Sequence, residues 1–321
     1  MSEFKCLMNR RDFLKAASLG GLTILSGCYD DGEKVIDLMP TQPGEDYLKN
    51  IVGQPQDTLT TKLNVAKVED VGDFQFEPTK VETVRPDIFN PGYFSLFDVL
   101  AHLANEGKID LTYHFDAEMD TNVIDNLNGS SNWWYQVWYD GGWPERSFHR
   151  MDYYPVKEKM RIAFSKIDPS ELESRYKIWR TEMHRRTANG GKIIIPEVQI
   201  RDKGNDSIWT FENVEVKPHN LRPDFFVEGT VTAADVIMSL GDISEITYQM
   251  LWYDNIGDAE IKNYYVEGIN NRTHSGMCGF VYELGEKDTI RGNHIHVTPD
   301  IRIIQSPGYV LFFWIKLGPC N

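Results

Sequence analysis

Two arginine–histidine pairs are the residues of this chain whose types and spacing could do chemistry. Arg146 is followed three residues later by His149, and Arg291 is followed in the same way by His294. An arginine can bind a carboxylate or phosphate through two parallel hydrogen bonds, and a nearby histidine can donate, accept or ligate a metal. Three interpretations stay open: a structural loop, a site for an anionic ligand, or a metal site to which His296 would contribute in the second pair.

An aromatic run precedes the first pair. On a predicted strand, Trp133 points to one face, while Trp134 and Trp138 point to the other. One face can enter the core, and leaving the other in water would forgo roughly 1.5–3 kcal/mol for each large side chain. We therefore expect the second face to contact a sister module, a flat or sugar-like ligand, or a partner protein. The predicted ligand-binding set combines both features: Trp133, Trp134, Trp138, Arg146, His149, Arg291 and His294.

The sequence predicts no catalytic residues. It contains no nucleophile elbow, phosphate loop, dinucleotide fingerprint, haem-attachment motif or metalloprotease motif. No metal ligand set is predicted, and the cofactor is unknown. Spaced acids recur in both halves and could bind calcium, but the glycine-turned loop of an EF-hand is absent, so we expect solvated loops. These acids are Asp116, Glu118, Asp120, Asp254, Asp258 and Glu260.

The elements that must position these residues are duplicated. Residues 85–100 recur without a gap as residues 222–237, with seven of sixteen positions identical. Unrelated stretches would share roughly one, so the chain contains a repeated module. Each copy includes a predicted helix that opens with a capping box, Ser95 with Asp98 and Thr232 with Asp235. We interpret both aspartates as structural.

A third helix is predicted between the two copies. Asp168 and Pro169 open it at the N-cap and first position, and the run 189–191 ends it. Apolar residues recur at spacings of four, three and four, so one stripe is expected to pack on one or both modules. The stripe consists of Leu172, Tyr176, Trp179 and Met183.

In the first copy, the helix, an asparagine-containing turn and the strand Trp133-Trp134-Tyr135-Gln136-Val137 follow one another. This order resembles the domain of unknown function at the C-terminus of transcobalamin and intrinsic factor, which also occurs in many bacterial surface proteins. The resemblance implies a fold related to soluble ligand-binding β-grasp domains. In the vertebrate relatives the domain caps a corrinoid held by a helical barrel, which this chain lacks. The second copy departs from the pattern, because our alignment places Gly276 and Cys278 where Trp133 and Tyr135 stand.

The predicted fold class is α+β, with two tandem β-grasp-like modules joined by a linker helix. Each module is expected to contain a strand pair, one helix and further strands. The predicted boundaries are a signal peptide at 1–28, a flexible tether at 29–57, module one at 58–167, the linker helix at 168–191 and module two at 192–321.

The N-terminus predicts export and anchoring. Arg10 and Arg11 begin a twin-arginine motif, and the apolar run 16–27 is too short to span a bilayer. A lipobox ends at Cys28, which by resemblance to bacterial lipoprotein signals becomes the lipidated first residue of the mature protein. We therefore expect a protein that the Tat pathway exports to the bacterial cell envelope, anchored by lipid on the periplasmic or outer surface. Without residues 1–28 the net charge is −17, which disfavours nucleic acid as a partner.

Cys278 and Cys320 are the remaining cysteines of the predicted mature chain. In an oxidising compartment they are a candidate disulfide that would attach the C-terminus to module two. The alternative, metal ligation by Cys278 with His274, would supply two ligands of the four that a structural zinc site needs.

These features predict a non-catalytic, lipid-anchored binding protein of the cell envelope. Its ligand would be a flat, acid-bearing molecule such as a tetrapyrrole or corrinoid, or a sugar. Two alternatives stay open. One is an accessory or scaffold subunit that docks an envelope protein through the aromatic strand, and the other is a metal-dependent enzyme that uses His294 and His296.

Replacing Cys28 with alanine should leave the exported protein soluble in the periplasm, because the thiol that accepts the lipid is gone. Membrane fractionation of cells expressing either form measures this directly. Sedimentation of Cys28→Ala with membranes through detergent-free washes would contradict the anchor.

Overall fold

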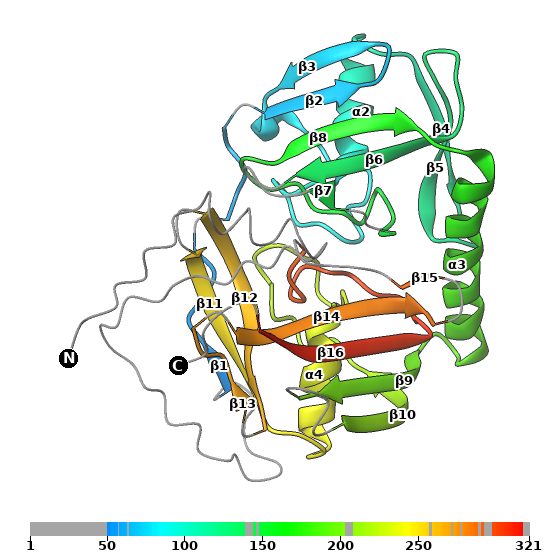
Figure 1. Cartoon of the computed structure of the whole chain (residues 1–321). Coiled ribbons are helices and arrows are strands. Elements are labelled where there is room, and N and C mark those ends of the chain that lie inside the picture. Colours follow the sequence, from blue (N-terminus) through cyan, green and yellow to red (C-terminus); the bar gives the residue numbers. More distant parts are fainter. Residues whose placement is uncertain are drawn as a thin grey trace.

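The computed structural model describes residues 50–56, 58–62, 64–138, 144–145, 148–202, 208–256, 259–270, 272–276, 278–287, 290–291 and 297–316. These residues form an α+β structure with several sheets that mix parallel and antiparallel strands (Figure 1). None of the helices in these ranges is long and apolar enough to cross a bilayer.

Module one contains a five-stranded sheet, one helix and a separate two-stranded ribbon. The strand of this sheet that comes last in the chain lies parallel to the strand that comes first, and it is antiparallel to its other neighbour in the sheet. In sheet order, the strands are β3 (Gly72–Phe76), β2 (Asn64–Val68), β8 (Arg161–Lys166), β6 (Trp133–Trp138) and β7 (Pro144–Glu145). The remaining elements are the short helix η2 (Pro78–Lys80), α2 (Leu96–Asn105) and the ribbon strands β4 (Leu111–Asp116) and β5 (Thr121–Leu127).

Module two repeats the order of the five-stranded sheet strand for strand. Again, the strand that comes last in the chain lies parallel to the strand that comes first and antiparallel to its other neighbour in the sheet. In sheet order, the strands are β10 (Ile208–Val216), β9 (Ile193–Arg201), β16 (Tyr309–Lys316), β14 (Cys278–Glu286) and β15 (Ile290–Arg291). The other elements are α4 (Ala233–Asp242), β11 (Tyr248–Ile256), β12 (Ala259–Ile269) and β13 (Arg272–Thr273).

The strand pairings correct the alignment of the two copies. Tyr135 lies opposite Phe164, and Tyr282 lies opposite Phe312 at the same place in the second sheet. Both tyrosine hydroxyls donate to a backbone carbonyl, 2.7 Å from that of His149 and 2.6 Å from that of Val297. Tyr282, and not Cys278, is therefore the counterpart of Tyr135. The sequence alignment was wrong because it followed short identities across a loop of unequal length.

Both capping boxes are present, as predicted. Ser95 and Asp98 exchange side-chain and backbone hydrogen bonds, and so do Thr232 and Asp235. The second carboxylate oxygen of Asp98 accepts from the amide of Val84 at 2.6 Å, which attaches the preceding loop to the helix. The structural interpretation of these aspartates is confirmed.

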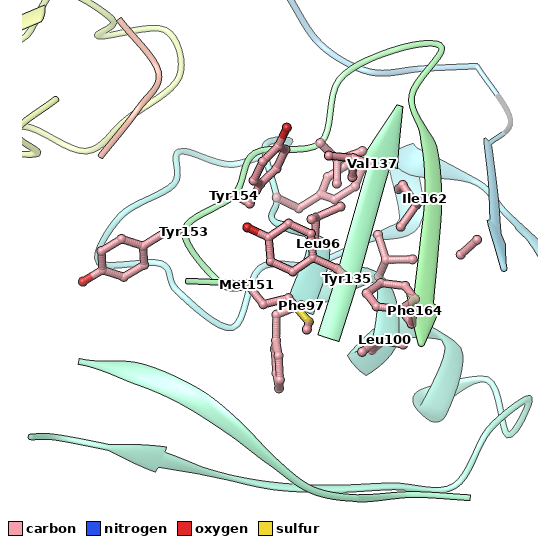
Figure 2. Close-up of a cluster of buried hydrophobic side chains, with 14 of the residues drawn as sticks. Leu96, Phe97, Leu100, Tyr135, Val137, Met151, Tyr153, Tyr154, Ile162 and Phe164 are labelled. Atoms are coloured by element: carbon pink, nitrogen blue, oxygen red, sulfur yellow. The ribbon is translucent and has the colours of Figure 1, made fainter. Parts of the chain in front are cut away.

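The core of each module forms where its helix faces its sheet. Figure 2 shows side chains of α2 opposite those of β6 and β8, with Tyr153 and Tyr154 of the loop that precedes β8 beside them. The residues of this contact include Leu96, Phe97, Leu100, Tyr135, Val137, Ile162 and Phe164, each less than a tenth exposed.

The linker helix α3 (Pro169–Ala188) starts after the N-cap Asp168, as predicted. Leu172 and Trp179 of the predicted stripe are buried, whereas the other two members are half-buried. The buried face also contains Arg175 and Glu182, which an apolar pattern cannot reveal. Near the other end of α3, two nitrogens of Arg185 each lie 2.9 Å from a carboxylate oxygen of Glu286 on β14. The helix therefore contacts both modules, and Figure 1 shows it running beside them.

The two modules also meet directly through the repeated loops. Phe89 and Phe226, which are equivalent positions of the repeat, form an antiparallel bridge. The amide of Asn90 donates to the carbonyl of Phe225 at 3.1 Å, and the amide of Val227 donates to the carbonyl of Ile88 at 2.9 Å. Because 88–90 correspond to 225–227, each loop makes the same contact with the other. This is the self-complementary geometry of a two-fold interface, here within one chain.

The N-terminal part of the described chain joins module two. Strand β1 (Ile51–Val52) pairs in parallel with Met250 and Leu251 of β11. Gly53 follows with a φ of 87°, and a Cβ at this position would lie 2.6 Å from that of Trp252. The expected flexible tether at 29–57 is therefore too long at its C-terminal end, because a two-residue strand carries too little periodicity to be seen in the sequence.

Phe89→Ala and Phe226→Ala should each lower the free energy of unfolding by about 3–5 kcal/mol, because each removes a buried ring at the module interface. The rings lie 5.6 Å apart, so the double variant should lose less than the sum of the two. Urea denaturation measures both effects. Phe115→Ala, at a ring that is 51% exposed, is the control and should cost about 1 kcal/mol or less. Losses below about 1 kcal/mol at both interface positions would contradict this role.

Candidate functional site

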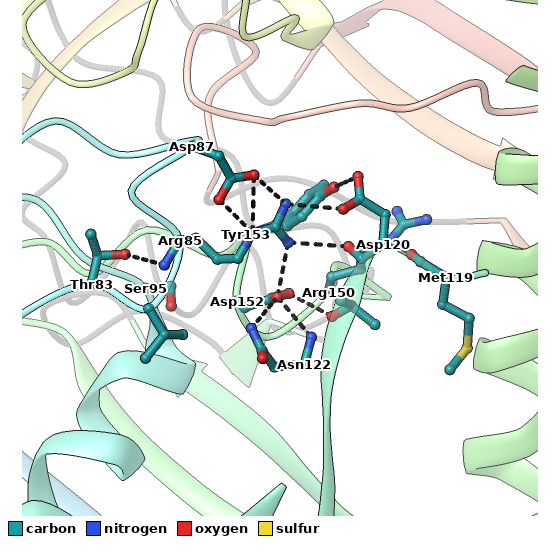
Figure 3. Close-up of polar contacts among 12 residues, drawn as sticks. Thr83, Arg85, Asp87, Ser95, Met119, Asp120, Asn122, Arg150, Asp152 and Tyr153 are labelled. Atoms are coloured by element: carbon teal, nitrogen blue, oxygen red, sulfur yellow. Dashed lines mark hydrogen bonds and ion pairs between the residues drawn. The ribbon is translucent and has the colours of Figure 1, made fainter. Parts of the chain in front are cut away.

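The most strongly repeated polar residues form two buried clusters. In module one, Arg85 donates to Asp87 and to the buried Asp152, its Nη1 lying 3.0 Å from the latter carboxylate. Its Nη2 donates at 3.0 Å to Asp120, whose other carboxylate oxygen accepts from Tyr153 at 2.6 Å (Figure 3). Every nitrogen of this guanidinium therefore already donates to a group of its own module.

Module two contains the matching cluster. Arg222 donates to Asp224 and to Asp300, with its Nη1 2.8 Å from the latter carboxylate. Asp300 also accepts from the amide of Tyr264 at 2.9 Å, just as Asp152 accepts from that of Asn122 at 2.8 Å. The two buried aspartates are thus counterparts. Each ties its arginine loop to the β-ribbon of its module.

The clusters differ at one position. By the same register, Lys262 is the counterpart of Asp120, and both have a φ near 50°. The arginine of module two therefore lacks the carboxylate that Asp120 supplies in module one. Burial opposes the charge of Arg222, but its hydrogen bonds and proximity to Asp224 and Asp300 still raise its pKa above the ordinary value. Both arginines therefore stay charged, and each fixes its loop to the rest of its module through a buried ion pair.

The linker helix covers the second face of the aromatic strand at Trp134. Trp134 stacks on Trp179 of α3, with ring centroids 5.7 Å apart and planes inclined by 29°. The guanidinium of Arg175 lies over the Trp134 ring at 4.1 Å, a cation–π contact. Of the alternatives, neither a ligand nor a partner covers Trp134, because the chain itself does. Trp138 is half-buried, with the guanidinium of Arg161 5.3 Å from its ring.

The other predicted site residues do not gather in one described cavity. Trp133 is buried, and its indole nitrogen donates to the carbonyl of Ser130 at 2.9 Å. His149 is buried with its ring perpendicular to that of Tyr153. The backbone of Arg291 belongs to β15. The side chain of Arg291, and all of Arg146, His294 and His296, lie outside the described residues.

Of the histidines in the two pairs, only His149 lies within the described residues, and its position can be compared between the modules. Val297 takes the place of His149, because each accepts a hydrogen bond from the equivalent tyrosine. A ligand site formed by these pairs stays a prediction, because Arg146 and His294 lie outside the described residues.

Cys278 is completely buried and disulfide-bonded. Its predicted partner Cys320 and the predicted lipid-bearing Cys28 lie outside the described residues. Among the residues that the structure describes, no group of three or more histidine, cysteine or acidic side chains could hold a metal. Asp116 instead accepts from the amide of Glu118 at 2.8 Å, within a turn.

A lysine is buried where the modules meet. Lys157 donates through Nζ to the carbonyl of Ile261 on β12, and its side chain is 6% exposed. Burial, followed by the nearby charge of Arg222, lowers its pKa to about 7. Sequence patterning gives no sign of this, because nothing distinguishes Lys157 from a surface lysine.

An open groove with a volume of about 570 Å³ lies in module two, between β10 and the end of α4. Val214 and Leu240 are its buried apolar residues, and Phe211 is half-buried. Four acids and one lysine also line it: Glu212, Glu215, Asp242, Glu245 and Lys217. Sequence analysis did not identify this groove, although the apolar and acidic alternation of β10 is visible in the chain.

Comparison of the chain with protein-family models, with curated proteins and with solved structures finds no match.

Arg222→Met should lower the free energy of unfolding by about 3–5 kcal/mol, because it leaves Asp300 buried without its cation. Adding Asp300→Asn should restore part of that loss, since the uncompensated charge is then removed. Chemical denaturation of both variants measures this. Arg161→Met, at an exposed arginine over Trp138, is the control and should cost about 1 kcal/mol or less. A double variant no more stable than the single one would contradict a stabilising ion pair between Arg222 and Asp300.

Lys157→Met should change how stability depends on pH. The native pKa of Lys157, about 7, lies below the ordinary lysine pKa of 10.5, so between these values the unfolded chain binds a proton that the native protein does not. Stability of the wild type should therefore rise with pH across this range relative to the variant, by at most about 1.4 kcal/mol per pH unit. Denaturation midpoints at pH 6, 8 and 9.5 measure the difference. Parallel profiles would contradict a neutral buried lysine.

Proposed function

We propose that this protein is a lipid-anchored, non-catalytic binding protein of the bacterial cell envelope, and that it binds another polypeptide. The observation that carries the proposal is the contrast between two surfaces. The chain's own helix covers Trp134 on the aromatic strand, whereas an apolar-floored groove along an edge strand is open. Edge strands beside helices are surfaces to which extended polypeptides add.

We infer that each module is β-grasp-like. The strand order supports this, because each module begins with a hairpin, continues with a helix and places its last strand in parallel beside its first. The sheet thereby packs one face on the helix. Repetition of this order in both modules supports the tandem arrangement with α3 as the connecting helix.

A non-catalytic binding role is consistent with the contacts of the duplicated arginines, Arg85 and Arg222. The donors of Arg85 and Arg222 are directed at buried carboxylates of their own modules. Their repetition is explained by folding, so it is no argument for a duplicated catalytic or anion site. A flat ligand that stacks on Trp134 would have to displace Trp179 and Arg175.

Native mass spectrometry of the full-length protein, purified in non-ionic detergent from its own host, tests the proposal. A complex that releases a second intact polypeptide is the expected result. Retention of a small molecule in place of a polypeptide would support the tetrapyrrole, corrinoid or sugar alternative and overturn ours. A bound metal with hydrolytic activity would support the enzyme alternative.

A further inference from the structure

We propose that the groove between β10 and α4 of module two binds an extended, lysine-containing segment of a partner protein as an added β-strand. This inference rests on the proposed function and names the surface and the chemistry of the partner. It is argued from the edge strand, from the groove charges and from the equivalent edge of module one.

Strand β10 is an open edge. It is nine residues long and pairs with β9 on one side, while no described strand lies on its other side (Figure 1). An edge of this kind presents unpaired amides and carbonyls to an incoming chain. Apolar side chains flank it, with Ile208 52% exposed on β10 and Ile243 64% exposed just after α4. The edge therefore offers backbone pairing and apolar contact together.

The groove is acidic. Glu215 is paired with Lys192 and Asp242 with His219. Glu212 and Glu245 are exposed, and within the described ranges neither has an ion-pair partner. Uncompensated carboxylates beside an apolar floor favour a partner segment that alternates basic and apolar side chains.

Module one shows what a lysine does at the equivalent place. The amide of Lys108 donates to the carbonyl of Leu103, and the amide of Glu245 donates to that of Leu240, so the two residues are counterparts after α2 and α4. Lys108 reaches across to the edge strand β3, where its Nζ donates to the carbonyl of Gln75 at 3.0 Å. Module one thus covers part of its own edge with a lysine. Module two has a glutamate there, and a lysine of the partner segment would supply the missing positive charge.

Charge also disfavours a second copy of this chain as the occupant. Antiparallel pairing of two β10 strands would bring Glu212 and Glu215 of one copy close to the same residues of the other, and like charges opposite each other destabilise a pair of strands. A basic partner segment satisfies both the backbone and the carboxylates.

Isothermal titration of full-length protein in non-ionic detergent tests the groove. The probes are three capped ten-residue peptides: alternating lysine and valine, alternating glutamate and valine, and the lysine peptide with N-methylated valines. We expect the first peptide alone to bind, and its affinity to fall as salt rises. N-methylation removes the donors needed for strand pairing. Binding by the glutamate or the N-methylated peptide would overturn the proposal.

Variants locate the site. Glu245→Lys gives module two the residue that covers part of the edge of module one, and it should weaken binding of the lysine peptide by about tenfold or more. The matched control is Asp73→Lys, the same charge change on the exposed edge strand β3, which should leave the affinity unchanged. An unchanged affinity in Glu245→Lys would overturn the assignment of the groove.

The same variant separates this inference from the proposed function. If purified Glu245→Lys retains the native polypeptide partner, the binding function stands and the groove assignment fails. If the wild type retains no polypeptide, the proposed function fails, whatever the synthetic peptides do.

Discussion

The reciprocal contact between the two repeated loops is the constraint on which the rest of the structure depends. Phe89 and Phe226 pair across it, and two matching hydrogen bonds flank them. Each loop is held by its own buried arginine, Arg85 or Arg222, so a loop cannot shift without breaking an ion pair from which water is excluded. The residues repeated most closely in sequence are therefore those that make the interface self-complementary.

Differences between the modules are where function can arise, because a fully symmetric pair would present two identical surfaces. Helix α3 covers Trp134 in module one, and β1 extends the ribbon of module two. The loop after the helix ends with Lys108 in one module and Glu245 in the other. These changes place a lysine over part of one edge strand and leave its counterpart uncovered and acidic.

Much of the fold follows from local sequence signals, whereas the candidate site does not. Capping boxes at Ser95 and Thr232 and the N-cap at Asp168 depend on neighbours in sequence, and all three are present. The partners of Arg85 and Arg222 lie up to 78 residues away, and no periodicity connects them. The loops before the aromatic strands differ in length, so the sequence alignment matched Tyr135 with Cys278, whereas its structural counterpart is Tyr282. A groove formed by an edge strand and a helix end appears only once the sheet order is known.

Hydrogen exchange at the amides of Asn90 and Val227 tests the central claim most directly. If the two loops form one cooperative interface, both amides should show the same free energy of opening, equal to that of global unfolding. Variants at Phe89 and Phe226 should accelerate both together. Fast exchange at either amide, or protection of one without the other, would contradict an interface in which each copy of the repeat stabilises the other.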